Sequence, residues 1–254
     1  MDTISWTRFC EAREAYRSYV AELSIRLPEL RSVQQRLVDE REEASFPIDT
    51  PVVYNQALDK VQKDDEIKII LVADNPGRRE QAAENKRYLV GPSGKLADGF
   101  FRSHPELGID FRKNVLILNK TPIHTPRTAE LRELGRLGGT KLSQAIIDSQ
   151  KKMIELIRAF HDAINGSGPS AIPAALWIIG YSELGRGKLF EPFTRALEEA
   201  YPEGDPLRSS ILLFRHFSMN QFSVDIRKKS LAGEDLDVTL QRTGTEYRQR
   251  IFGW

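Results

Sequence analysis

The side chains that could do chemistry stand in four short polar segments, each placed directly after an apolar run. An asparagine amide offers one acceptor and two donors, and a histidine exchanges a proton near neutral pH. If the segments meet in the fold, amide, imidazole and hydroxyl groups can surround a polar ligand there. The segments are Ala73–Gly77, Asn119–Pro122, Gly180–Ser182 and His216–Asn220.

The apolar runs before these segments predict buried parallel strands, because they are continuous rather than alternating. Ligands of open α/β sheets lie outside the carboxyl ends of the strands, so we expect all four polar segments at one edge. Helical patterns between the runs leave room for crossover connections. The expected fold is α/β, a three-layer αβα sandwich with a four-stranded parallel sheet. Strands are predicted at Ile67–Val72, Val115–Leu118, Leu176–Ile179 and Ile211–Phe214, and helices at Leu96–Arg102, Leu142–Ile164 and Leu189–Tyr201.

The chain ahead of the first strand predicts a helical arm. Trp6–Ser45 has apolar residues at helical spacing, and Pro28 divides it into two helices. We expect residues 1–50 to pack as this arm on a main domain of residues 51–254. Gly166–Pro169 predicts a turn before the third strand, and Leu231–Trp254 is polar with few periodic apolar positions.

The composition is that of a globular protein, with 40% hydrophobic and 29% charged residues among 254. Met1–Val20 mixes charges with aromatics, and no apolar stretch approaches the roughly 20 residues of a membrane span, so we expect a cytoplasmic protein. The single cysteine, Cys10, excludes a disulfide framework, and the scattered histidines predict no metal site. Because the net charge is +1, a phosphate-rich partner needs a local basic patch. The candidates are Arg78–Arg79, Lys86–Arg87 and Arg227–Lys229.

Between Ile67 and Asn220 the chain resembles the uracil-DNA glycosylase superfamily in four ordered motifs. Ala73–Gly77 is similar to the Gly-x-Asn-Pro-Gly turn of the mismatch-specific and single-strand-selective branches, with alanine in place of the leading glycine. Tyr88–Leu96 is similar to the Pro-Phe-Val-Gly-x-Ala-Gly-x-Leu stretch of the iron–sulfur branch, although the cluster cysteines are absent. Val115–Asn119 resembles the strand that ends in a base-reading asparagine, and His216–Ser218 resembles the His-Pro-Ser loop.

The resemblance implies a monofunctional DNA glycosylase that excises uracil or a related deaminated base, as in base excision repair, and needs no metal or redox cofactor. By this resemblance Asn75 orients a water molecule, His216 donates a hydrogen bond to the leaving base, and Asn119 reads the base edge. Asp74 and either Tyr88 or Leu89 would also contact the base. The partner would be DNA containing a damaged base, bound by a monomer through Pro76, Gly77, Ser93, Gly94, Lys95, Ser218, Met219 and Asn220.

The sequence departs from the family pattern at the positions that handle the extracted base. Leu89 stands where an aromatic ring stacks on the base, so the neighbouring Tyr88 would have to supply that ring. Phe217 replaces the loop proline, and either Phe217 or Met219 could wedge into the base stack. Lys120 is expected to contact a phosphate rather than to act as an amine nucleophile. Ser93 and Lys95, close to a helix start predicted at Leu96, could receive another phosphate.

Two other functions are compatible with the same residues. A noncatalytic nucleic-acid-binding module could keep the fold and lose turnover, as the changes at Ala73, Leu89 and Phe217 allow. An unrelated enzyme could bind a small nucleotide at the same strand ends. Asn75 and Asn119 could be turn residues. His216 could share the structural roles expected for His104, His124 and His161.

Overall fold

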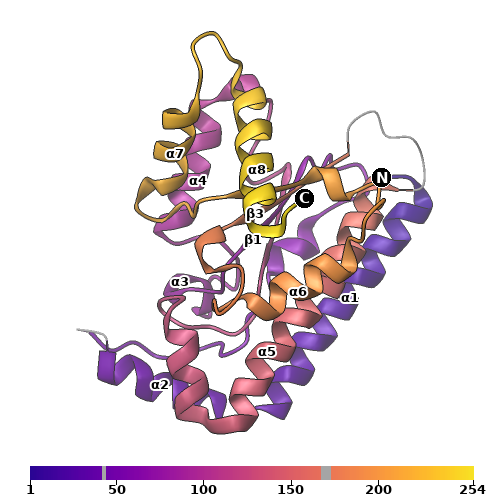
Figure 1. The fold of residues 1–254 in the computed structure, drawn as a ribbon. Helices are drawn as coiled ribbons and strands as arrows, with labels where there is room; N and C mark the ends of the chain where they lie inside the picture. The colour runs from indigo at the N-terminus through magenta and orange to yellow at the C-terminus, as the bar shows by residue number, and fades with distance from the viewer. Residues whose placement is uncertain (42–43, 167–172) are drawn as a thin grey trace.

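The computed structural model describes residues 1–41, 44–166 and 173–254, and in it the strands form one four-stranded sheet whose order is β2-β1-β3-β4 (Figure 1). All neighbouring strands are parallel. The four predicted strands are confirmed, with small shifts at their ends. The bounds are β1 Ile69–Ala73, β2 Val115–Asn119, β3 Ala175–Ile179 and β4 Ile211–Phe214.

Both faces of the sheet are buried, which explains why the strand sequences are continuously apolar. Ile70 and Val72 of β1 belong to one hydrophobic cluster, and Ile69, Leu71 and Ala73 belong to another on the opposite face. Side chains alternate between the faces of a strand, so a single apolar run supplies both cores. The fold is the predicted α/β sandwich of helices around a parallel sheet.

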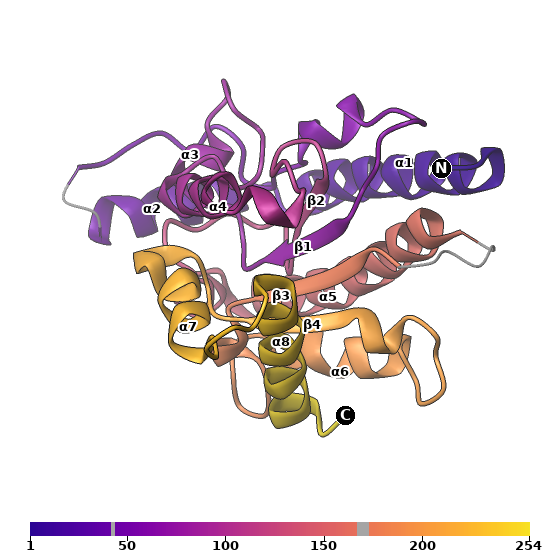
Figure 2. The same cartoon turned by 90° about the horizontal axis from the view of Figure 1, so that it is seen from above.

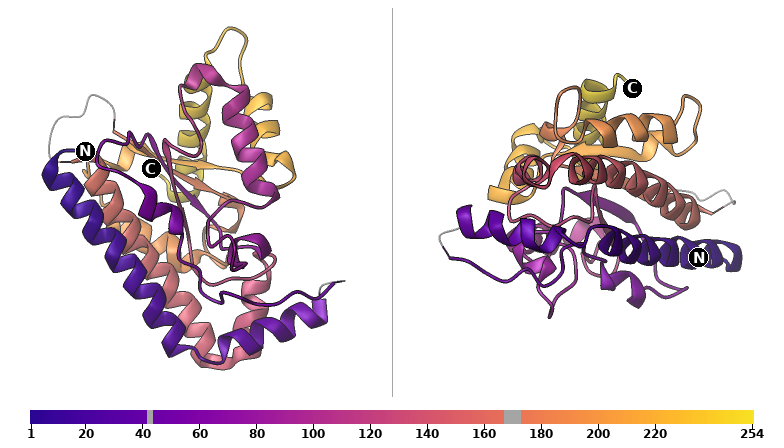
Figure 3. Two further views of the ribbon diagram at one scale, coloured as in Figure 1. Left: turned by 180° about the vertical axis from the view of Figure 1, so that it is seen from behind. Right: turned by 90° about the horizontal axis from the view of Figure 1, so that it is seen from below.

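One face is covered by α1 Thr3–Arg26 and α5 Glu130–Asn165, which lie side by side (Figures 1 and 3), and by α6 Glu191–Ala200. The predicted arm is confirmed as α1 followed by α2 Leu30–Arg41. Its Phe9, Tyr16 and Leu23 are buried in the same cluster as the sheet residues, so the arm is part of the main core. The helix predicted at Leu142–Ile164 is longer than expected, because α5 continues through a kink at Gly139, where φ is 72°.

The other face is covered by α4 Pro92–Ser103, α7 Gln221–Lys229 and α8 Leu236–Phe252. Seen from above, α4 lies toward β1 and β2, and α7 and α8 lie toward β4 (Figure 2). Aromatic rings connect these helices to the sheet and to each other. Phe101 of α4 stacks on Trp177 of β3 at 5.8 Å, and Phe100 of α4 meets Phe222 of α7 edge-on at 4.9 Å. The short helix α3 Arg78–Gln81 follows the β1 loop.

No helix was predicted in the polar tail Leu231–Trp254, yet most of it forms α8. Its buried face consists largely of small and hydroxyl-bearing residues, namely Thr239, Thr243 and Gly244, with Leu240 and Tyr247. A Cβ at Gly244 would lie 2.6 Å from the Leu212 Cβ, so the glycine allows α8 to approach β4 closely. Such a face has little hydrophobic periodicity for sequence analysis to detect.

Two further predictions concern segments outside the sheet. Of the turn predicted at Gly166–Pro169, only Gly166, which ends α5, is among the described residues. The helix predicted from Leu96 begins four residues earlier, with Gly91 as its N-cap and Pro92 in its first turn. None of the described helices combines the length and hydropathy that a membrane-spanning segment requires.

Candidate functional site

The four polar segments begin at one edge of the sheet, as predicted. Ala73 pairs with Asn119 at the ends of β1 and β2, and Ile179 pairs with Phe214 at the ends of β3 and β4. The four strands end at the same level of the sheet, so the residues that follow them begin at the same edge. This edge therefore gathers Asp74, Asn75, Asn119 and the loop that contains His216.

The side-chain amide of Asn75 is anchored through its nitrogen atom. Its Nδ2 donates to the Thr125 Oγ1 at 2.8 Å, and the carbonyl oxygens of Ile123 and Thr125 lie 3.4 and 3.5 Å away. The structure gives the Asn75 Oδ1 no hydrogen bond with any described residue. Because Nδ2 is anchored, the amide orientation is fixed and Oδ1 remains able to accept a hydrogen bond from a ligand or water.

The side chain of Asn119 is buried, with 1% of its surface exposed. Its Nδ2 has no hydrogen-bond partner among the described residues. A buried donor without an acceptor costs about 1–3 kcal/mol, so such groups call for an explanation. A ligand carbonyl at the strand-end edge would supply the acceptor that the protein does not.

The tautomer of His216 is determined by Ser218. The backbone N–H of Ser218 donates to the His216 Nδ1 at 3.0 Å, and the Ser218 hydroxyl lies 2.8 Å from the same nitrogen. An Nδ1 that accepts leaves the proton of a neutral imidazole on Nε2. Burial lowers the pKa of His216 from its ordinary value, and the Lys120 charge acts in the same direction, whereas Asp74 opposes them. His216 is thus a neutral Nε2–H donor near pH 7.

Lys120 was predicted to contact a phosphate, and that prediction was wrong. Its side chain is completely buried, and its Nζ lies 2.5 Å from both the Asp74 Oδ1 and the Ile179 carbonyl oxygen. The same ammonium lies 4.9 Å from the centre of the Phe190 ring. The sequence argument reversed the direction of the side chain because the acceptors come from the ends of β1 and β3, which both lie on the inner side of β2 in the folded sheet.

The carboxylate of Asp74 is fixed on every side. Beyond Lys120, it accepts a hydrogen bond from the Thr128 hydroxyl at 3.2 Å. A Cβ on Gly180 would lie 2.7 Å from the Asp74 Oδ1, and Gly180 has φ 79°, so the glycine allows both the turn and the close approach. The end of β3 thus contributes space for the ion pair, and the Tyr181 ring that follows stacks on Tyr247 at 4.3 Å.

Glu80 connects the loop that follows β1 to the loop that precedes α4. Its carboxylate accepts from the backbone N–H of Gly77, and from those of Leu89 and Val90. Burial raises the pKa of Glu80, and these hydrogen bonds oppose that effect. Sequence reasoning missed Glu80 as a positioning residue, although its place three residues after Gly77 has the spacing of a capping box.

Tyr88 and Leu89 are both buried, with 0% and 4% of their surfaces exposed. The Tyr88 hydroxyl donates to the Val53 carbonyl oxygen at 2.6 Å and contacts the hydroxyl of Tyr16. Leu89 has φ 50°, which is unusual for a residue with a branched side chain. The structure therefore places the Tyr88 ring in the core with its hydroxyl against α1, and it leaves no exposed aromatic side chain at either position.

Ser93 and Gly94 lie in the first turn of α4, where backbone N–H groups precede the intrahelical bonds, and the Lys95 N–H already donates to the Gly91 carbonyl oxygen at 3.1 Å. Ser93 is half-buried, and Lys95 is exposed. A Cβ at Gly94 would lie 1.6 Å from the Leu89 carbonyl oxygen, so this glycine is required for packing of the helix on the preceding loop. The phosphate role predicted for these three residues remains a prediction.

The loop after β4 separates two side chains that were both predicted as wedges. Phe217 is 1% exposed and stacks on Phe222 at 4.4 Å, so it cannot serve as a wedge. Met219 is 81% exposed. Met219 and Asn220 have φ 52° and 55°, two successive left-handed residues that turn the chain back into α7. Pro76 is buried and Gly77 half-buried in the loop after β1.

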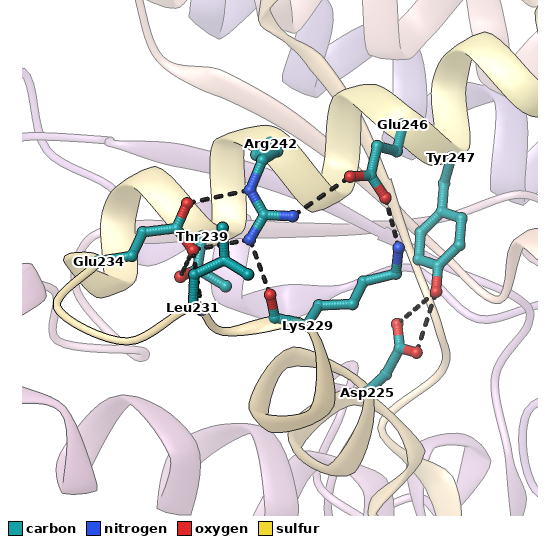
Figure 4. A network of polar contacts seen from close by, with 8 residues as sticks. All are labelled: Asp225, Lys229, Leu231, Glu234, Thr239, Arg242, Glu246 and Tyr247. Carbon is teal, nitrogen blue, oxygen red and sulfur yellow. Dashed lines mark hydrogen bonds and ion pairs between the residues drawn. The ribbon is translucent and has the colours of Figure 1, made fainter.

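One residue of the basic run Arg227–Lys229 takes part in a polar network within the protein. Lys229 contacts Glu246, and Arg242 donates to both the Lys229 carbonyl oxygen and the Glu234 carboxylate, each at 2.7 Å (Figure 4). This network joins α7 to α8. Arg227 and Lys228 are exposed, so only these two of the three residues present free charge.

Two residues after β2 support the site without having been predicted. Thr125 holds Asn75, and its hydroxyl donates to the Arg127 carbonyl oxygen at 2.9 Å. His124 donates from Nδ1 to the Pro76 carbonyl oxygen at 2.8 Å, and burial lowers its pKa to about 4. A neutral structural histidine was the role expected for His124.

A large cavity lies away from this edge. It has a volume of about 1140 Å³, is lined by α5, α6 and the loop before α6, and includes none of the predicted site residues. Across residues 1–41, 44–166 and 173–254, no group of three or more histidine, cysteine or acidic side chains is arranged to hold a metal ion. In comparisons with known proteins, no family model and no curated protein matched the chain.

Proposed function

We propose that the protein is a monofunctional DNA glycosylase that hydrolyses the N-glycosidic bond of uracil or a related deaminated base. The observation that carries this proposal is the buried Asn119 amide, whose Nδ2 has no partner in the part of the chain that the structure describes and which ends the strand beside Asp74 and Asn75. A base carbonyl would accept from Nδ2, and the amide oxygen would accept from the imino hydrogen of uracil. The parallel sheet between helical layers agrees with the fold that the resemblance to the uracil-DNA glycosylase superfamily implies.

The proposed chemistry uses Asn75 and His216 on the two reacting groups. The oxygen of a water molecule bonds to the sugar carbon as the carbon–nitrogen bond breaks, the base leaves with the bonding electrons, and the proton that the water loses ends on the released base. The Asn75 Oδ1 would accept a hydrogen bond from this water. The His216 Nε2–H would donate to the base carbonyl oxygen, where negative charge develops. A neutral imidazole suits this role because its Nε2–H can donate a hydrogen bond to the developing anion without transferring the proton.

Lys120 supports the monofunctional form of the proposal. A bifunctional enzyme needs an accessible amine, but the Lys120 ammonium is buried and paired with Asp74. The Asp74 carboxylate is likewise committed to Lys120 and Thr128. The contact proposed between Asp74 and the base therefore falls to the backbone of Asp74.

A noncatalytic binding module of the same fold is the second candidate, and the placement of Tyr88 favours it. With Tyr88 in the core and Leu89 beside it, neither position offers an exposed ring for stacking on an extracted base. Stacking contributes about 1–3 kcal/mol per base in proteins that bind single strands, so its loss would weaken retention of the base. The module would still bind DNA through the strand-end loops.

The test is incubation of the protein with single- and double-stranded oligonucleotides that carry uracil, hypoxanthine or xanthine, followed by detection of abasic sites. A glycosylase produces abasic sites from at least one substrate, and Asn119→Asp should lose uracil cleavage selectively because it exchanges the amide donor for an acceptor. Binding without abasic sites would favour the module. An unchanged ratio of uracil to cytosine cleavage in Asn119→Asp would remove Asn119 from base recognition.

A further inference from the structure

A second cavity, of about 190 Å³, lies along β2, the outermost strand of the sheet on its side. Its walls include apolar side chains such as Val61, Ile67 and Phe111. Four basic residues also line it, and Asp65 is the single acidic residue among the described lining residues. The cavity is far larger than the roughly 30 Å³ that one water molecule occupies in the liquid. The four basic residues are Lys60, Arg87, Arg112 and Lys113.

Arg87 is the unusual member of this group. The structure gives its guanidinium no hydrogen bond or ion pair with any described residue, and its Nε is completely buried without an acceptor. Guanidinium groups in folded proteins normally pair with carboxylates or carbonyl oxygens when they are taken out of water. Arg87 as a whole is half-buried and lines the cavity, so an acceptor for its guanidinium can come from a ligand there.

Arg112 brings a second guanidinium to the same cavity. Its Nη2 donates to the Leu89 carbonyl oxygen at 2.6 Å, and its guanidinium lies 4.7 Å from the centre of the Phe111 ring. Burial lowers the pKa of Arg112, and the charge of Arg87 lowers it further, so the two cations repel each other, whereas Asp98 and Glu80 oppose this effect on Arg112. The Asp65 carboxylate accepts a hydrogen bond from the Gln62 N–H at 2.9 Å.

We propose that this cavity binds a phosphate-type oxyanion between the guanidinium groups of Arg87 and Arg112. Planar guanidinium groups donate two parallel hydrogen bonds to phosphate oxygens, and an anion between them would relieve their repulsion. Lys60 and Lys113, both exposed, would add positive charge at the rim. This site is separate from the strand-end edge, and the proposal does not depend on glycosylase activity.

The phosphate could come from a free phosphate compound or from the backbone of a nucleic acid. Either source would contact Arg112, which donates to the Leu89 carbonyl oxygen. Glu80 accepts from the N–H groups of Leu89 and Val90 and also from that of Gly77 in the loop after β1, so the phosphate site is connected to this strand-end loop. The shared chemistry is recognition of a tetrahedral oxyanion. The experiment below distinguishes the two sources.

The test uses the full chain in inorganic phosphate and in chloride at matched ionic strength. For the wild type, the midpoint of thermal unfolding should rise with phosphate concentration, because a ligand that binds only the folded state stabilises it. Arg87→Gln should unfold at or above the wild-type temperature in chloride, since a repulsive charge is removed, and should lose the rise in phosphate. The control Arg26→Gln changes the same charge on an exposed part of α1 and should behave as the wild type.

Calorimetric titration with inorganic phosphate should show affinity weakened about tenfold or more in Arg87→Gln, as expected for loss of charge-assisted hydrogen bonds. If the salt dependence of oligonucleotide binding is the same in the wild type and in Arg87→Gln, the phosphate bound at this site comes from a free phosphate compound. A nucleic-acid phosphate is the source if Arg87→Gln makes that salt slope shallower by about one. Equal unfolding midpoints of the wild type in phosphate and chloride, or equal phosphate affinity of Arg87→Gln and wild type, would overturn the proposal.

Discussion

Asn75 and His216 each have one polar atom fixed by a neighbour and one atom left for a ligand. Thr125 holds the Asn75 Nδ2, and the Ser218 N–H holds the His216 Nδ1. The remaining acceptor on Asn75 and the remaining donor on His216 have opposite hydrogen-bonding character. Water and a leaving base need this combination, because one donates to the protein and the other accepts from it.

Replacing either residue by alanine should lower turnover by roughly two to four powers of ten, the range for loss of an acid–base or anion-stabilising group. Single-turnover cleavage of the best substrate measures this effect. Ser218→Ala should retain most activity, because the backbone N–H that fixes the tautomer remains. His104→Ala, which alters an exposed histidine on a different loop, serves as the control. Near-normal cleavage by both Asn75→Ala and His216→Ala would sink the proposed mechanism.

Asn119→Ala should change the free energy of unfolding little, because it removes a donor that has no partner among residues 1–41, 44–166 and 173–254. The matched control is Asn55→Ala, which also alters an asparagine that is 1% exposed. Asn55 donates to the Ile117 carbonyl oxygen and accepts from the Ala57 and Tyr88 N–H groups. Its loss should cost about 1–3 kcal/mol or more. Urea denaturation of the two variants measures the difference, and equal losses would mean that Asn119 is a structural residue.

At the scale of the elements, the ends of β1, β2 and β3 are joined by the ion pair of Asp74 and Lys120. Removing one buried charge and leaving the other is expected to cost about 3–5 kcal/mol. Lys120→Met should therefore destabilise the protein strongly, and adding Asp74→Asn should recover a large part of the loss. The free energies of unfolding of both single variants and the double variant form the test. Additive losses would show that the pair is not coupled.

The start of α4 gives a test of backbone packing. Gly94→Ala places a methyl group against the Leu89 carbonyl oxygen, a backbone atom that cannot move aside, so the loop must shift. We expect a loss of about 1–3 kcal/mol, the range for overpacking. In the same helix Gly99→Ala meets nothing within 4 Å and should stabilise the protein by about 0.5–1 kcal/mol. Thermal unfolding compares them, and the same sign for both would contradict the packing argument.

The sequence was sufficient for the strands and for the edge on which the polar segments meet. Runs such as Val115–Leu118 are apolar on both faces, so their position and the place of Asn119 follow from local pattern. The direction of Lys120 was not predictable in this way, because its partners arrive from Asp74 and Ile179, which are distant in sequence. The same holds for the partnership of Asn75 with Thr125. Local pattern thus located the site residues, whereas tertiary contacts determined which of their atoms are free.

At the scale of the whole molecule, two buried histidines make stability depend on pH. Burial lowers the pKa of His124 and of His161 from 6.5 to about 4. The unfolded chain therefore binds more protons between these values, so the stabilisation is complete above pH 6.5 and is lost as pH falls toward 4. Each histidine should reduce the free energy of unfolding by about 2 kcal/mol between pH 7 and pH 5.

Urea denaturation at pH 5, 6 and 7 measures this dependence. His161→Gln should have a shallower pH slope than the wild type, because it removes a buried group whose pKa is lowered. Burial raises the pKa of Glu80, so this group changes the pH dependence of stability in the opposite direction. Its contribution is present in the wild type and in the variant, and it cancels when their pH slopes are compared. An identical slope in His161→Gln and wild type would contradict a neutral buried His161.

The order of the strands also has a consequence for biosynthesis. Asn75 and Asn119 follow β1 and β2, whereas His216 follows β4, which leaves the ribosome after the other three strands of this sheet. β4 adds to the outside of the sheet against β3, and α8, which is made after it, covers it. Domains fold as their chain emerges, N-terminal parts first. The imidazole therefore joins the two asparagines only after β4 has been made, and a ribosome stalled before β4 carries a nascent chain in which the candidate site lacks its proposed leaving-group donor.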